Sequence, residues 1–198
     1  MLRFDDGHLE DLARLSPRDR TAFAAACAER LLPAHASYMA LCGGSDTAIL
    51  RENLDRLWAD IDANSMQPPE LSARIAMTEN LLPDPDDDSE WPIERGIAED
   101  AVTALLYALD CRKDGKVDQA GAAAKRAYEA LETILLDRAG NQNDLGVLES
   151  VRQHVSIQTE LERQKRDLGE LVRGTIPIKV LRERARLESQ TFLPISAE

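Results

Sequence analysis

The chain of 198 residues is poor in aromatic residues, which make up 4% of it. Ala and Leu are abundant instead, and both lose little free energy in a helix, whereas aromatic and β-branched residues favour strands. No apolar run approaches the roughly 20 residues that span a bilayer, and residues 1–10 lack the apolar core of a signal peptide. We therefore expect an all-α, cytoplasmic protein that does not enter a membrane.

Cysteine and histidine are also scarce and carry no recognisable chemistry. Cys27, Cys42 and Cys111 form an odd set without metal-ligand spacing, and each lies in an apolar helical stretch, which predicts buried free thiols in a reducing compartment. The three histidines form no ligand cluster. No nucleophile elbow, phosphate-binding glycine loop or zinc-protease motif occurs. The sequence thus assigns no catalytic residue and implies no cofactor.

Basic residues are scarce in the first half of the chain. Residues 1–100 hold 9 basic and 21 acidic residues, whereas residues 101–198 hold 15 of each, so the net charge of −12 comes entirely from the first half. A negative field repels nucleic-acid phosphates and anionic lipid. It favours a basic protein as partner, although acidity that only keeps the protein in solution explains the same composition.

Apolar periodicity and helix-capping residues predict a single domain over residues 1–198, a bundle of about seven or eight helices. Ser16-Pro17 begins a helix that Pro33 interrupts, and a second short helix ends at Gly43-Gly44. Trp58 lies in the apolar stripe of the next helix and is expected in the core. Apolar helices over about 93–113 and 117–138 are expected at the centre of the bundle.

The C-terminal helices are predicted over about residues 144–190. A long helix runs from Asp144 to about Val172, and its charged middle, Thr159–Asp167, is interpreted as a solvent-exposed face. Pro177 begins the last helix. Asp100, within an apolar run, is expected to pair with an arginine of another helix, and Arg30 and Arg56 are the candidates.

Four stretches carry a resemblance to a known family: Phe23–Pro33, Leu54–Trp58, Leu82–Asp87 and Ile97–Leu105. In this order and spacing, and together with the helix Ala120–Leu131, they resemble the YjaG family of uncharacterised bacterial proteins over about residues 9–137. The resemblance implies an all-helical fold. It implies no activity, and no catalytic residue is carried over from it.

The segment 83–92 holds three prolines and five acids, which exclude regular structure. Its first alternative is a partner-binding surface in which Trp91 is an apolar anchor among carboxylates. Its second is a divalent-metal site, because the spacing begins like an EF-hand loop, but Ser89 and Arg95 stand where Gly and Glu are needed. The partner-binding set is Asp84, Asp86, Asp87, Asp88, Glu90 and Trp91. The metal-binding set is Asp84, Asp86, Asp88 and Glu90.

The leading functional hypothesis is a non-catalytic protein-binding module that uses this acidic face to engage a basic partner, for example as an immunity or antitoxin-type neutraliser. One alternative is a small-molecule or divalent-metal-dependent enzyme with its site near the acidic loop and Asp100. Another is a homo-oligomeric structural protein that associates through the long helix Asp144–Val172. No nucleic-acid or membrane partner is expected.

Overall fold

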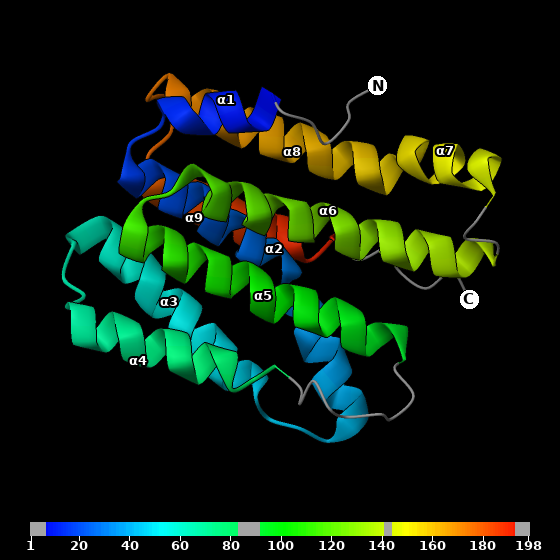
Figure 1. Cartoon of the computed structure of the whole chain (residues 1–198), viewed down its shortest axis with the longest axis horizontal. Coiled ribbons are helices and arrows are strands. Elements are labelled where there is room, and N and C mark those ends of the chain that lie inside the picture. Colours follow the sequence, from blue (N-terminus) through cyan, green and yellow to red (C-terminus); the bar gives the residue numbers. More distant parts are fainter. Residues whose placement is uncertain (1–6, 83–91, 141–143, 193–198) are drawn as a thin grey trace.

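The computed structural model describes residues 7–82, 92–140 and 144–192, and in these ranges it contains nine α-helices and no strand (Figure 1). The predicted all-α class is confirmed. The helices are α1 (Gly7–Arg14), α2 (Pro17–Cys42), α3 (Thr47–Ala63), α4 (Pro68–Glu79), α5 (Ile93–Asp114), α6 (Val117–Ala139), α7 (Leu145–Gln153), α8 (Val155–Val172) and α9 (Ile178–Ser189).

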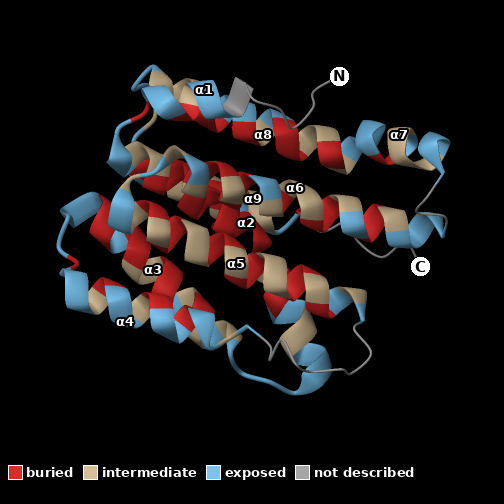
Figure 2. Ribbon diagram, viewed as in Figure 1, coloured by how far each residue is buried: buried red, intermediate tan, exposed pale blue. Residues whose placement is uncertain are grey.

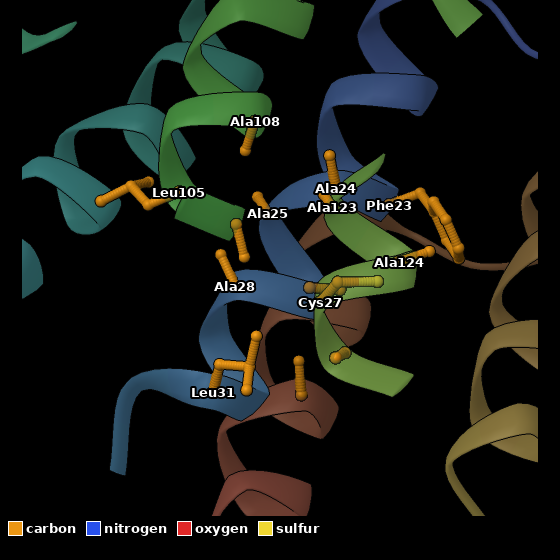
Figure 3. Packing of buried hydrophobic residues seen from close by; sticks show 14 of the residues in the cluster. Phe23, Ala24, Ala25, Cys27, Ala28, Leu31, Leu105, Ala108, Ala123 and Ala124 are labelled. Atoms are coloured by element: carbon orange, nitrogen blue, oxygen red, sulfur yellow. The ribbon is translucent and has the colours of Figure 1, made fainter. Parts of the chain in front are cut away.

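Helix α2 is the central helix of the bundle, and it packs against α3, α5, α6, α8 and α9. Buried residues are concentrated along it and along the facing sides of α5 and α6 (Figure 2). In Figure 3, Ala25 and Ala28 of α2 lie beside Leu105 and Ala108 of α5. Such small side chains let the helix backbones approach closely. The centre predicted for α5 and α6 therefore includes α2 as well.

Helix α2 runs through Pro33 without a break, so the predicted interruption there is wrong. Its start agrees with the prediction, because the Ser16 side chain accepts a hydrogen bond from the Asp19 N–H and Pro17 is the first helical residue. Its end agrees too, since Gly43 adopts a left-handed conformation at φ 68°. Buried residues on both sides of Pro33 hold the two halves of the helix in line.

The predicted long C-terminal helix is also wrong, because it breaks at His154. This residue ends α7 and begins α8, and its Nδ1 accepts a hydrogen bond from the Ser156 N–H at 3.2 Å. The interpretation of Thr159–Asp167 as a solvent-exposed face fails as well. Glu160, Gln164 and Asp167 lie at the spacing of one helix face and are fully buried against the rest of the bundle.

Arg30 of α2 explains why these acids are buried. Its Nε lies 3.2 Å from Glu160, and its Nη1 lies 2.9 Å from Asp167 and 3.3 Å from Glu188 of α9. The guanidinium and both α8 carboxylates are shielded from solvent. A carboxylate withdrawn from water needs an ionic or hydrogen-bonding partner. One arginine therefore joins α2 to both C-terminal helices.

The predicted burial of Trp58 and of two cysteines is confirmed, whereas the predicted burial of the third cysteine is wrong. Trp58 is completely buried, as predicted, and its indole N–H donates to Glu29 at 2.9 Å. Cys27 and Cys111 are buried free thiols, but Cys42 is exposed because it is the last residue of α2, beyond the packed part of the helix. Within the described ranges, no helix is both long and apolar enough to cross a membrane.

Candidate functional site at the acidic end of the bundle

The residues predicted to bind a partner or a metal, Asp84, Asp86, Asp87, Asp88, Glu90 and Trp91, lie outside the described residues. The two points between which this segment runs are described. Leu82 follows the end of α4, and Pro92 is the N-cap of α5.

The C-terminal end of α2 lies beside the start of α5 at this position. The pKa of the Tyr38 phenol is raised by its hydrogen bond with Cys42 and by burial, and it responds also to the charges of Arg95 and Glu99 on α5. Leu41, on the last turn of α2, is 73% exposed. This end of the molecule therefore presents an exposed apolar side chain beside the start of α5.

Two exposed acids lie at the neighbouring helix starts. Asp46 precedes α3, and Glu94 lies in the first turn of α5, where the helix dipole favours a negative charge. Leu82 adds a second exposed apolar side chain. We call the surface formed by Leu41, Asp46, Leu82 and Glu94 the acidic end.

Asp100 pairs with an arginine of another helix, as expected, but the arginine is neither of the predicted ones. Its Oδ1 lies 3.1 Å from Nη1 of Arg126 on α6. Arg30 is taken by the α8 and α9 carboxylates, and Arg56 pairs with Glu70. Burial raises the pKa of Asp100 to about 6, although Arg126 opposes the shift. The carboxyl thus exchanges its proton close to neutral pH.

Potential metal ligands are spread over residues 7–82, 92–140 and 144–192. These ranges contain no group of three or more His, Cys, Asp or Glu side chains that could hold a metal ion. One histidine of the bundle forms a structural hydrogen bond. His35 Nδ1 and the Thr47 hydroxyl form a hydrogen bond of 2.9 Å that joins α2 to the start of α3, and burial lowers the His35 pKa.

The other end of the bundle holds a cleft that the sequence did not predict. A cavity of about 470 Å³ lies where α2 begins and α3 and α5 end. Arg112 borders it, donating through Nε to the buried Asp60 and through Nη2 to Asn64 at 2.9 Å. Asp60 also accepts from the Met66 N–H at 2.5 Å.

A second cavity of about 310 Å³ shares Asn64 and Arg112 with the first. Asp60 and Arg112 are 52 residues apart in the sequence, and neither belongs to a motif. The sequence shows only that each of them lies near the end of a predicted helix. Sequence reasoning therefore had no basis for pairing them.

The fold defines a class: an all-helical protein built around a central, alanine-rich helix. Within that class the chain belongs to the family described as "Protein of unknown function (DUF416)", whose model matches residues 7–196. No curated protein matches the chain.

Among solved structures, the fold is similar to the crystal structure of a DUF416 family protein from Shewanella baltica OS155. The TM-score is 0.77, the sequence identity is 20%, and the match covers 89% of this chain and 92% of that chain. At this identity the likeness establishes a common fold and carries no information on activity.

Proposed function

We propose that this protein is a non-catalytic, cytoplasmic binding module that engages a basic partner protein through its acidic end. The proposal rests on two exposed apolar side chains, Leu41 and Leu82, which lie at helix ends together with the exposed acids of the acidic end. Protein interfaces combine apolar anchors with a polar rim. Complementary charge around the anchors speeds encounter and selects the partner.

The use of arginines in the first half of the chain supports this proposal. Arg30 is buried within the bundle. Arg56 pairs with Glu70, and Arg74 pairs with Glu52. Basic side chains that are held in such pairs contribute little positive field outside the protein. Segment 83–91 contributes five more acids to this half of the chain.

One concrete form of this function is an immunity or antitoxin-type protein that captures a basic toxin. Within the DUF416 family we infer further that the chain is YjaG-like, from the stretches that carry that resemblance. Two alternative functions, an enzyme and a self-associating protein, are each supported by one specific observation. Asp100, with its pKa near 6, would serve an enzyme with acid/base chemistry. Exposed Leu145 and Val155 on α7 and α8 would serve self-association.

The decisive experiment purifies the tagged full chain from its native cytosol at low and moderate salt and identifies what co-elutes. The test variant is Asp86→Lys with Asp87→Lys. Its matched control is Glu162→Lys with Glu183→Lys, which changes the net charge equally at exposed acids of α8 and α9.

We expect a stoichiometric basic protein that salt releases, that the test variant loses and that the control retains. A partner that binds the test variant as well as the wild type would remove the acidic segment from the function. Absence of any partner from all three proteins would overturn the proposal. A divalent-ion titration followed by thermal melting and a size measurement in solution would then test the enzyme and the oligomer.

A further inference from the structure

Three arginines converge on one carboxylate oxygen between α3 and α9. Oδ1 of Asp55 accepts hydrogen bonds from Nη2 of Arg51 at 2.9 Å, from Nη2 of Arg182 at 2.7 Å and from Nη2 of Arg186. Arg51 also donates through Nε to the second oxygen of Asp55, at 3.1 Å. We call these three arginines the arginine cluster.

The charges of the cluster do not cancel. Besides Asp55, its acid is Glu29, which accepts from Arg51 Nη2 at 2.9 Å and from Arg186 Nε at 3.3 Å. Three guanidinium groups thus face two carboxylates, in a protein of net charge −12. Nε of Arg182 is buried and has no hydrogen-bond partner among the described residues. The cluster has both a surplus positive charge and an unused donor.

The cluster is also within reach of solvent. The side chains of Arg51, Arg182 and Arg186 are 28%, 26% and 42% exposed, and that of Asp55 is 40% exposed. The network around Arg30 differs, because Arg30, Glu160 and Asp167 are all shielded from water. A small ion can therefore reach the arginine cluster, whereas it cannot reach Arg30.

We propose that Arg51, Arg182 and Arg186 form a binding site for a phosphate-type oxyanion, and that the carboxylate of Asp55 occupies this site when the ligand is absent. Planar guanidinium groups match phosphate oxygens geometrically and bind them through paired hydrogen bonds. A phosphate group offers separate oxygens to donors that now share Oδ1 of Asp55. It also brings the additional negative charge that the cluster lacks.

The ligand and the Asp55 carboxylate compete for the same donors, so two substitutions should act in opposite directions. Asp55→Asn removes the internal competitor and should tighten binding. Arg182→Gln removes a donor that bonds to Asp55, while Arg51 and Arg186 still hold Glu29, and it should weaken binding. A purely structural ion-pair cluster predicts no such opposition in ligand affinity.

The experiment measures the affinity of the full chain for inorganic phosphate by calorimetry, at pH 7 and constant ionic strength. We expect Asp55→Asn to lower the Kd about tenfold and Arg182→Gln to raise it about tenfold, the effect of one charge-assisted hydrogen bond. Glu52→Gln, one turn earlier on α3, and Arg14→Gln on α1 are the matched charge controls, and their Kd should stay within about twofold of wild type.

Further arms identify the source of the anion. Glycerol phosphate that binds as tightly as inorganic phosphate supports a site for a phosphate ester, and weaker binding of it supports free phosphate. Equal binding of phosphate and succinate would overturn the preference for a phosphate-type anion. No measurable binding to wild type and Asp55→Asn, or an unchanged Kd in Arg182→Gln, would overturn the site. If Asp55→Asn does not fold, as judged by circular dichroism, the comparison of Arg182→Gln with Arg14→Gln decides.

Discussion

Replacing Arg30 by Met should destabilise the protein mainly through one orphaned carboxylate. Asp167 would keep Arg166 and Arg184, at 3.1 and 2.6 Å, whereas Glu160 would keep Arg163 at 3.9 Å as its nearest cation. Removing one partner of a buried ion pair costs about 3–5 kcal/mol. Because one of the two buried acids remains paired, we expect about 3 kcal/mol, measured as the loss of unfolding free energy in urea at pH 7.

A second substitution tests this explanation. Glu160→Gln in the Arg30→Met background removes the orphaned charge and should recover more than half of the loss. Arg166→Met is the control, because this arginine contacts Asp167 and Glu188 but is 40% exposed, and its loss should cost about 1 kcal/mol or less. A loss below about 1 kcal/mol in Arg30→Met, or no recovery in the double variant, would refute the reasoning.

The same variant should show a defined pH dependence. Burial raises the pKa of Glu160 even with Arg30 present, and loss of Arg30 raises it further. A carboxyl with a raised folded-state pKa contributes stability below its ordinary pKa of about 4.3, and that contribution is lost as pH rises through the folded-state value. The deficit of Arg30→Met should therefore shrink as the pH falls from about 7 to about 5.

Two further changes follow from the fold. Asp100→Asn removes a carboxyl whose pKa burial raises to about 6. In urea titrations, the unfolding free energy of wild type should therefore fall by up to about 3 kcal/mol relative to that of the variant as pH rises from about 4 to about 7. A difference that does not change with pH would contradict this. Pro33→Ala restores a backbone donor inside the continuous helix α2 and should stabilise the protein by about 1–3 kcal/mol, seen as a higher melting temperature. A lower melting temperature would mean that packing of the proline ring outweighs this gain.

Local chemistry made several helix ends predictable. Ser16-Pro17 begins α2, Gly43 ends it, Gly115 ends α5 in a left-handed conformation, and Pro177 precedes α9. Each of these signals depends on backbone geometry within a few residues, which the sequence states directly. Pro33 misled the prediction because its cost to a helix is finite. Packing on both sides of it supplies more free energy than the missing hydrogen bond removes.

The candidate site was less predictable from the sequence than the helix ends. The concentration of acids in residues 1–100 is visible in the sequence, and the binding role given to segment 83–91 stays a prediction. The exposed position of Leu41 and the nearness of α2 to the start of α5 depend on how the helices pack. The same holds for the cleft at Asp60 and Arg112, whose partners come from different helix ends.

What the sequence alone determined about this protein is its helical class, several helix boundaries and its charge asymmetry, because these follow from residue type and local spacing. Only the tertiary structure decided which charges are buried. Glu160 and Asp167 have the pattern of a solvent-exposed helix face, yet Arg30, 130 and 137 residues away, draws them into the interior. Hydropathy describes a side chain in water, whereas burial of a charge depends on a partner that only the folded chain brings near.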